Sequence, residues 1–439
     1  MKSESLRSSL RELEGFSRAT AMKKIRYGVV GIKGVGRLHI DSVEKNPAAD
    51  LAALVDINEP LVRRVSQERR VRAFTDYRDM LEEGVVDAVS IATPHDLLAP
   101  IALDCLNAGV HVFVEKPFAI RISEADAVVR AAKARDLKLC VGYLQRTFRL
   151  SLAMKRLIES GAIGNLMHVL WTWHEFRPES YYTPDPWRGT FRDAGGGVLM
   201  SQVSHQLDLI CWMLGKPVRV SAFMANQLHN AEIEDIVCAN ILFDSGTLGS
   251  LQFSINQARA HSVRQIAGDR GLILVEDLKS LGDDEDDEIL LGTYGDRLSR
   301  IITQLPGDGD QPPLSWRRIR LSDPSALPEL LPKSTARKID SKLAATRRTL
   351  LQRVGFGSKY ERPTGHSVLL DSFIDAILDG GEPIITGESA RSTLELINAL
   401  IISGLRNKTV DLPIDPDEYD CVANDLSNGT IGVPMLHHF

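Results

Sequence analysis

Residues 112–117 read Val-Phe-Val-Glu-Lys-Pro, an apolar run that ends in a carboxylate, an ammonium and a proline. The apolar run is typical of a buried strand, and Pro117 should end it because proline has no N–H for a neighbouring strand. In open α/β sheets, ligands bind in the crevice beyond the strand ends. Lys116 is therefore placed to point into a site, although these six residues alone are more often an exposed Glu-Lys pair in a loop.

A glycine-rich turn lies between two strands upstream of this stretch. Residues 25–30 are predicted to form a strand, a helix then runs to about residue 45, and a second strand over 50–55 ends at Asp56. The turn after the first strand contains Gly31, Ile32, Lys33, Gly34, Val35 and Gly36. Its N–H groups, at the positive end of a helix, suit a pyrophosphate, and an acid about 20 residues later suits ribose hydroxyls.

One position departs from the usual G-x-G-x-x-G pattern. Counted from Gly31, the second glycine should be residue 33, which is lysine. Glycine at this position lets the backbone approach the phosphates. We expect either that Gly34 takes over part of this task or that the Lys33 side chain turns outward.

Strands and helices continue to alternate after the turn. We expect a strand over 86–92 followed by Thr93, Pro94 and His95, then a helix over 98–108, a strand over 111–114, a helix over 123–135 and a strand over 137–142. Such alternation predicts a parallel sheet with right-handed crossovers. Residues 24–143 are therefore interpreted as a Rossmann-type, doubly wound dinucleotide-binding domain.

The pattern becomes β-rich in residues 144–439, which predicts a second, α+β domain. We expect a helix over 152–160, strands over 166–173, 219–224, 235–243, 249–256 and 263–275, a hairpin turn at 244–246, and helices over 369–378 and 390–405. Hairpin-connected strands indicate a large, mostly antiparallel sheet with one open face. Residues 1–23 are expected to be an N-terminal arm.

An irregular insertion is predicted over residues 278–350. It contains an acidic run (283–288), a segment rich in Pro and Gly (305–314) and a basic stretch of helical character (333–353). Charge runs of this kind are usually solvated faces.

A glycine run, Gly195-Gly196-Gly197, precedes a predicted helix that carries further polar residues. Ser201 and His205 are four positions apart and should share a helical face. Ser204 and Asp208 have the same spacing. On spacing alone, a histidine on a helix is most often a core residue whose ring nitrogens are hydrogen-bonded. Asp208 is readily explained as a residue that fixes the position of the helix.

Composition excludes several classes of protein. The net charge of −6 gives no general attraction to nucleic acid or to an acidic membrane. Five scattered cysteines argue against a disulfide framework or a zinc site, so we expect no metal and a reduced cytoplasm. The N-terminus lacks the apolar core of a secretory signal, and no stretch approaches the ~18 apolar residues of a membrane span.

Taken in order, these motifs resemble the Gfo/Idh/MocA family of oxidoreductases. The resemblance rests on Gly31 to Gly36, Asp56, Thr93-Pro94, Glu115-Lys116-Pro117 and Gly195-Gly196-Gly197 with His205 and Asp208, and it covers roughly residues 24–275 and 365–413. It implies nicotinamide and substrate held between a Rossmann domain and an open-faced α/β domain. It also implies a cis Lys116–Pro117 bond.

The resemblance also implies roles for individual residues. Lys116 matches the family's active-site lysine and His205 its catalytic histidine. The expected cofactor-binding residues are Gly31, Lys33, Gly34, Val35, Gly36, Asp56, Thr93, Pro94, His95, Glu115, Lys116, Trp187 and Arg188, and the expected substrate-binding residues are Lys116, His174, Ser201, Gln202 and His205.

Three residues depart from the family pattern. Lys33 replaces a glycine, Leu98 stands where many members have a histidine, and Ser201 replaces the aspartate of inositol-dehydrogenase-like members. The last difference affects the expected substrate. Without a carboxylate at position 201, imidazolium is less stabilised, so His205 should be a weaker base.

The expected function is oxidation of a secondary hydroxyl of a sugar, glycoside or polyol by NAD(P), with His205 as acid/base and Lys116 as the orienting cation. The alternatives are a lyase or hydrolase that uses tightly bound NAD transiently, and a non-catalytic NAD-binding regulator. Asp56 favours NAD over NADP, although Arg63 and Arg64 leave room for a phosphate. Apolar positions Leu248, Leu251 and Phe253 suggest a homodimer or tetramer through the open sheet face.

Overall fold

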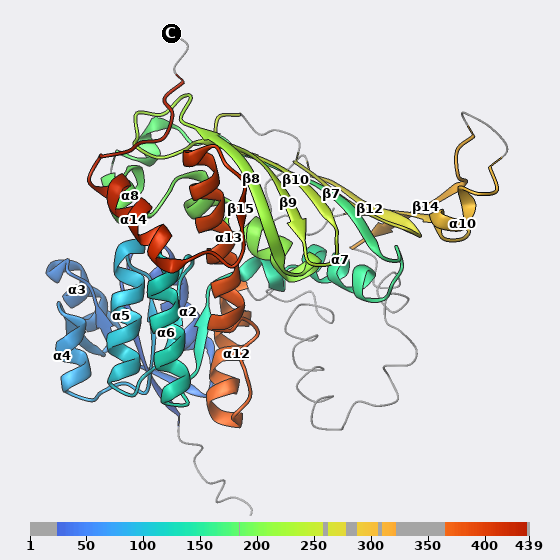
Figure 1. Cartoon of the computed structure of the whole chain (residues 1–439). Coiled ribbons are helices and arrows are strands. Elements are labelled where there is room, and N and C mark those ends of the chain that lie inside the picture. Colours follow the sequence, from blue (N-terminus) through green and yellow to red (C-terminus); the bar gives the residue numbers. More distant parts are fainter. Residues whose placement is uncertain are drawn as a thin grey trace, which may run out of the picture.

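The computed structural model describes residues 24–183, 185–257, 262–277, 288–305, 310–321 and 365–436. Two sheets form its framework, and helices from both ends of the chain pack between and around them (Figure 1). The expected N-terminal arm, the acidic run over 283–287 and the basic stretch over 333–353 lie outside the described residues.

The first sheet is parallel and has the strand order β3-β2-β1-β4-β5-β6. Its strands are β1 (Ile25–Val30), β2 (Ala49–Val55), β3 (Arg72–Phe74), β4 (Ala88–Ile91), β5 (His111–Val114) and β6 (Leu139–Val141). The helices around it are α2 (Val35–Lys45), α3 (Glu59–Arg69), α4 (Tyr77–Glu82), α5 (His95–Asn107) and α6 (Ile122–Ala134). The predicted Rossmann sheet is confirmed, and its apolar strands are buried because helices cover both faces.

The second sheet has nine strands in the order β14-β13-β12-β11-β7-β10-β9-β8-β15. These are β7 (Leu166–His174), β8 (Pro217–Ala225), β9 (Ile236–Phe243), β10 (Leu248–Ser254), β11 (Ser262–Gly268), β12 (Gly271–Asp277), β13 (Glu288–Tyr294), β14 (Leu314–Arg320) and β15 (Val410–Asp411). Among these strands, β10 and β7 pair in parallel and the other neighbours pair antiparallel. The predicted mostly antiparallel sheet is confirmed.

The remaining helices follow β6 in the chain, and those that contact the second sheet pack on one of its faces (Figure 1). They are α7 (Arg149–Glu159), α8 (Phe191–Ala194), α9 (Ser204–Leu214), α10 (Leu298–Ile301), α12 (Gly365–Asp379), α13 (Gly387–Arg406) and α14 (Pro416–Ser427), with short turns at η1 (Leu144–Thr147), η2 (Glu179–Tyr181), η3 (Pro186–Gly189) and η4 (Val198–Gln202). α13 contacts both α6 and β8, and α12 packs against α2, so the end of the chain joins the two domains (Figure 1).

Some predicted boundaries are wrong. The single strand expected over 263–275 is two strands, because a turn at Asp269 and Arg270 reverses the chain between β11 and β12. Part of the expected irregular insertion is regular, since β13 and β14 extend the sheet edge. The small elements β3, α4, β15 and α14 were not predicted; β3 and β15 have only three and two residues, too few for a periodic pattern.

The opposite face of the second sheet carries exposed apolar side chains. Phe223 on β8 and Leu248 on β10 are 71% and 59% exposed, and Leu170 is exposed on β7, the strand next to β10. We expected Leu251 and Phe253 on this face as well, but both are buried. Side chains alternate along the strand, so these two point to the helix-covered face and Leu248 to the exposed one.

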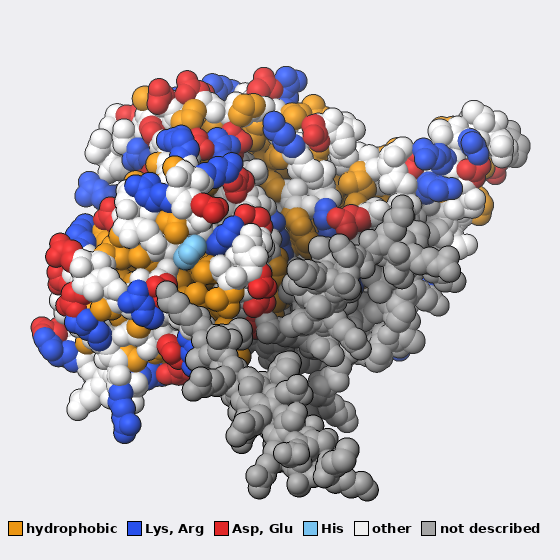
Figure 2. All heavy atoms as spheres, turned by 90° about the horizontal axis from the view of Figure 1, so that it is seen from below, with side chains coloured by type: hydrophobic (Ala, Val, Ile, Leu, Met, Phe, Trp, Pro, Cys, Tyr) orange, Lys and Arg blue, Asp and Glu red, His pale blue; other side chains and the backbone are white. Residues whose placement is uncertain are grey.

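On the face shown in Figure 2, acidic and basic side chains are interspersed. Over the part of the chain that the structure describes, no helix has the length and apolarity to cross a bilayer.

Candidate active site

The glycine-rich turn has the geometry needed to approach a pyrophosphate. Gly31 has a positive φ of 82°, and a Cβ on Gly36 would lie 1.9 Å from the carbonyl oxygen of Gly31. Side chains are therefore excluded where the turn enters α2. Gly34 also has a positive φ, of 51°, and the Lys33 side chain is exposed. Lys33 thus leaves the tight part of the turn free, although it replaces a glycine; Val35 is the first residue of α2.

Asp56 lies beside this turn at the end of β2. Its Oδ2 accepts a 3.1 Å hydrogen bond from the backbone N–H of Ile32, and its Oδ1 accepts one of 2.9 Å from Asn58. These bonds fix the carboxylate at the carboxyl edge of the sheet. The turn and the acid lie at the same edge of the sheet, an arrangement that in dinucleotide-binding folds suits a pyrophosphate and a ribose.

Lys116 follows β5 at the same edge of the sheet. The Lys116–Pro117 peptide bond is cis, as predicted. The Lys116 ammonium donates a 2.8 Å hydrogen bond to the backbone carbonyl of Ser201, which belongs to the second domain. Burial lowers the pKa of Lys116 to about 8, against the opposing effect of the neighbouring Glu115.

His205 stands near this ammonium, in the first turn of α9. Its pKa lies well below the ordinary value, first because the ring is buried and then because Lys116 is close and positive. The ring of Tyr143 packs edge-on against it at 5.8 Å. The Nδ1 of His205 and the hydroxyl of Tyr143 are both buried, and neither has a hydrogen-bond partner among the described residues. A neutral imidazole with a free nitrogen can accept a proton.

The glycine run has a steric cause that the sequence did not show. A Cβ on Gly197 would lie 1.9 Å from the backbone oxygen of Glu234, so the two segments touch. The buried Glu234 carboxylate accepts hydrogen bonds from the backbone N–H groups of Gly197 and Leu199, at 2.9 and 3.0 Å. Burial raises its pKa to about 7.

The helix expected after the glycine run is interrupted. Residues Val198–Gln202 form a π-helical turn, and α9 begins only at Ser204. Contrary to our expectation, Ser201 and His205 therefore do not belong to one continuous α-helix. Ser201 nevertheless enters the site through its backbone, and its buried hydroxyl has no partner in the described structure.

Asp208 has a structural role, as its position on the helix suggested. It forms a buried bidentate ion pair with Arg146, with N–O distances of 2.5 and 2.7 Å, and also accepts a hydrogen bond from Thr393. These contacts tie α9 to η1 and α13. Asp208 is thereby fully engaged away from the reacting groups.

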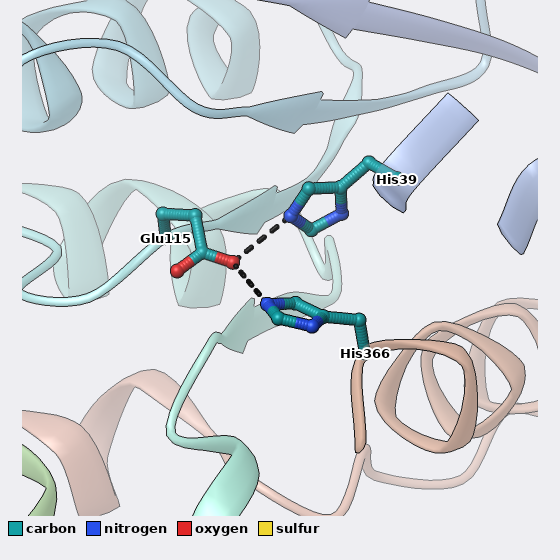
Figure 3. A group of neighbouring side chains, drawn as sticks. All are labelled: His39, Glu115 and His366. Atoms are coloured by element: carbon teal, nitrogen blue, oxygen red, sulfur yellow. Dashed lines mark hydrogen bonds and ion pairs between the residues drawn. The ribbon is translucent and has the colours of Figure 1, made fainter. Parts of the chain in front are cut away.

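Glu115 is held by two histidines from distant parts of the chain. Its Oε1 lies 2.9 Å from Nε2 of His39, on α2, and 3.4 Å from Nε2 of His366, on α12 (Figure 3). All three side chains are buried. Glu115 was expected to line the cofactor, whereas His39 and His366 were not singled out, because nothing in their spacing links positions 39, 115 and 366.

The remaining cofactor-side residues gather at the start of α5. Thr93 and Pro94 directly precede this helix. His95 bonds the backbone oxygen of Ala194 at 2.9 Å, and its ring packs edge-on against Trp187 at 4.9 Å. Burial, followed by the charge of Lys116, lowers the pKa of His95 to about 3. His95 is therefore a neutral ring that joins the two domains.

Arg188 belongs to a second cluster of polar side chains near Lys116. It stacks on Trp187 and donates a 2.8 Å hydrogen bond to the hydroxyl of Tyr181. Gln202 donates to the same hydroxyl at 2.9 Å and accepts a 3.0 Å bond from Arg177. The positive charges of both arginines lower the pKa of Lys116, which indicates that they lie close to it.

Some residues near this cluster differ from the expected site residues. Arg177 and Tyr181 were not predicted as site residues, since they lie in an irregular segment without periodic pattern. His174 is the last residue of β7. Because side chains alternate along a strand, it points to the other face of the sheet from Trp171, whose indole N–H donates to Gln206 on the helix side. The expected role of His174 in substrate binding therefore gains no support from this position.

Two family models match the chain, one in each domain. The first, described as an oxidoreductase family with an NAD-binding Rossmann fold, matches residues 25–143, and the second, the GFO/IDH/MocA C-terminal domain, matches residues 151–274. The chain belongs to the GFO/IDH/MocA family. Its N-terminal domain is thus an NAD-binding Rossmann domain, and the resemblance drawn from the motifs is confirmed.

Curated relatives in this family include enzymes that act on sugars and polyols. A UDP-N-acetylglucosamine 3-dehydrogenase of Acidithiobacillus ferrooxidans is 31% identical over 235 residues, which cover 53% of this chain and 68% of that protein. A myo-inositol 2-dehydrogenase of Thermotoga maritima is 26% identical over 285 residues, which cover 63% and 81%.

Solved structures share the fold over nearly the whole chain. The WlbA dehydrogenase of Bordetella pertussis, in complex with NADH and UDP-GlcNAcA, has a TM-score of 0.69 and 24% identity, covering 90% of this chain and 99% of its own. A levoglucosan dehydrogenase in complex with NADH has a TM-score of 0.69 and 20% identity, covering 89% and 100%. At these identities the likeness shows the fold alone.

Proposed function

We propose that this GFO/IDH/MocA protein is an NAD-dependent dehydrogenase that oxidises a secondary hydroxyl of a sugar, glycoside or polyol. The observation that carries the proposal is the convergence of Lys116 and His205, from two domains, at the edge of an NAD-binding sheet. The curated relatives support the substrate class. Bound NAD would supply the hydride acceptor.

The residues divide the remaining chemistry between them. Alcohol oxidation releases a proton from the hydroxyl and develops negative charge on its oxygen. The buried, neutral His205 is suited to take the proton, and the Lys116 ammonium is suited to stabilise the charge where little water competes. The unpartnered Ser201 hydroxyl and Tyr143 hydroxyl supply further hydrogen-bonding groups for a polyhydroxylated substrate.

NAD is the proposed cofactor rather than NADP. Asp56 stands at the end of β2 with its carboxylate fixed by Ile32 and Asn58, where its charge would oppose a 2′-phosphate. Arg63, on the following helix, is engaged by Glu59 at 2.7 Å. We expect calorimetry to give tighter binding of NADH than of NADPH, and comparable or tighter binding of NADPH would contradict this assignment.

A homodimer or homotetramer joined through the second sheet completes the proposal. Phe223, Leu248 and Leu170 form part of an apolar face that no helix of the described structure covers. Exposed apolar surface of this kind usually marks an interface.

The test is a screen of sugars, glycosides and polyols with NAD, first by thermal shift and then by NADH absorbance. A dehydrogenase forms one NADH for each substrate oxidised. Substrate consumption without NADH accumulation would instead indicate transient oxidation by a retained cofactor, as in a lyase or hydrolase. If Lys116→Ala and His205→Ala both keep normal turnover on the substrate found, the proposed site is wrong.

A further inference from the structure

A buried carboxylate lies directly beside the partly buried lysine of the site. Glu115 is 7% exposed, and its Oε2 accepts a 3.3 Å hydrogen bond from the backbone N–H of Lys116. Its other oxygen, Oε1, is the one that faces His39 and His366 (Figure 3). A Cβ on Gly142, the residue after β6, would lie 2.9 Å from the same oxygen, so the chain also approaches closely on this side. The carboxylate is therefore fixed from four directions.

Histidine and carboxylate groups in such a cluster can bind a metal, but the surroundings favour hydrogen bonds. The three ligand atoms lie within 4.8 Å of one another. A metal-bound imidazole normally donates its second N–H to an acceptor. The Nδ1 of His39 is buried without a partner among the described residues, so a metal on Nε2 would leave an unpaired donor. If instead a neutral His39 donates from Nε2 to Glu115, its Nδ1 carries a lone pair and no unpaired N–H.

The other groups around Lys116 do not supply a compensating negative charge. Burial is the largest cause that lowers the pKa of Lys116, and the positive charges of Arg188 and Arg177, from the segment between β7 and α8, lower it further. His95 on α5 and His205 on α9 are near enough to feel its charge, and both have lowered pKa values. The ammonium itself donates a hydrogen bond to the neutral carbonyl of Ser201. Glu115 is the anion that opposes these effects.

We propose that Glu115, fixed by His39 and His366, is a positioning residue that keeps the Lys116 ammonium charged in the working enzyme. Both histidines favour the ionised carboxylate: His39 is within hydrogen-bonding distance of it, and Nε2 of His366, which makes no hydrogen bond in the described structure, lies 3.4 Å from the same oxygen. His366 begins α12, so the end of the chain contributes to a charge at the edge of the N-terminal sheet. The kinetic consequence rests on the proposed function, but the charge of Lys116 can be measured without it.

The experiment measures how acetylation of Lys116 by acetic anhydride depends on pH, followed by mass spectrometry on the full-length protein. Only the neutral amine reacts. We expect Glu115→Gln to move the labelling curve of Lys116 at least one pH unit toward acid, which raises labelling at pH 6 roughly tenfold. His366→Ala and His39→Ala should shift the curve in the same direction by less, whereas His366→Gln, which keeps an amide donor, should restore it.

Glu124→Gln provides the matched control. Glu124 is a part-buried carboxylate in the same domain, but it bonds the backbone N–H groups of Ile120 and Arg121 and should leave the Lys116 curve unchanged. An unchanged curve in folded Glu115→Gln, or in His366→Ala if the first variant does not fold, would overturn the proposal. Stoichiometric metal in the purified wild-type protein would also overturn it. The acetylation experiment uses no sugar, so failure of the sugar screen would contradict only the proposed function.

Discussion

The Lys116 ammonium donates to the backbone carbonyl of Ser201 at 2.8 Å, across 85 positions of sequence. This contact places the lysine of the NAD-binding sheet against the π-helical turn of the second domain. The turn is fixed in its place by Glu234, which binds the backbone N–H groups of Gly197 and Leu199. The lysine and the histidine-bearing helix are thus brought together by main-chain geometry, not by a direct pair of side chains.

Replacement of Lys116 should reduce turnover without preventing NAD binding. Loss of one preorganised charged donor commonly costs ~10²–10³ in turnover. We expect Lys116→Ala to show a loss of this size below pH about 8, where the wild-type ammonium is charged, while calorimetry with NAD changes little because the Gly31–Gly36 turn and Asp56 are untouched. Normal turnover in Lys116→Ala would mean that the ammonium only joins the domains.

Turnover should fall in alkaline solution as Lys116 loses its proton. Its pKa is lowered to about 8, so the ammonium is charged below that pH and neutral above it. We therefore expect the rate of alcohol oxidation to decline as pH rises through about 8. The absorbance of NADH in the solvent alone, measured at each pH, is the control. Since the pKa of His205 is lowered, the decline on the acid side should lie below its ordinary value of about 6.5.

His205 should account for this acid limb. A positioned base contributes ~10²–10⁴ to the rate. His205→Ala should lose activity by that range and should also lose the acid limb of the pH profile. Ser201→Asp is expected to move the limb toward higher pH if its side chain reaches His205, since a nearby anion favours imidazolium. Near-normal turnover of His205→Ala would make the histidine structural.

The buried pair of Arg146 and Asp208 should stabilise the fold and play no part in catalysis. Asp208→Asn leaves the Arg146 charge buried without its partner, which typically costs about 3–5 kcal/mol in the free energy of unfolding. The double variant Arg146→Met/Asp208→Leu removes both charges and should recover much of this loss. Urea denaturation of the three proteins provides the measurement, and equal stability of Asp208→Asn and wild type would contradict the assignment.

An acidic side chain on the open sheet face should dissociate the proposed oligomer. Phe223 on β8 and Leu248 on β10 are exposed on that face, so Phe223→Asp and Leu248→Asp would each place a charge in the interface. Leu378→Asp, on the exposed side of α12, is the control. Light scattering should show a smaller species for the first two variants only. A monomeric wild-type protein at micromolar concentration would rule out the oligomer.

Local patterns determined the element types and the family. Apolar strands alternating with amphipathic helices predicted the parallel sheet, and the order of Gly31, Asp56, Lys116 and His205 indicated the NAD-binding site, because each feature depends on neighbours within a few positions. Short strands such as β3 and the division of residues 262–277 into β11 and β12 escaped prediction, since they lack a long enough periodic pattern.

Only the tertiary structure decided which distant groups meet. The contact of Lys116 with Ser201, the π-helical turn imposed where Gly197 meets Glu234, and the enclosure of Glu115 by His39 and His366 all join segments far apart in the chain. The pKa values of Lys116 and His205 also depend on this arrangement, because burial and neighbouring charge shift them from their ordinary values. A linear sequence names the ionisable groups, whereas the fold sets their distances and their exposure to water, and these two quantities determine the chemistry.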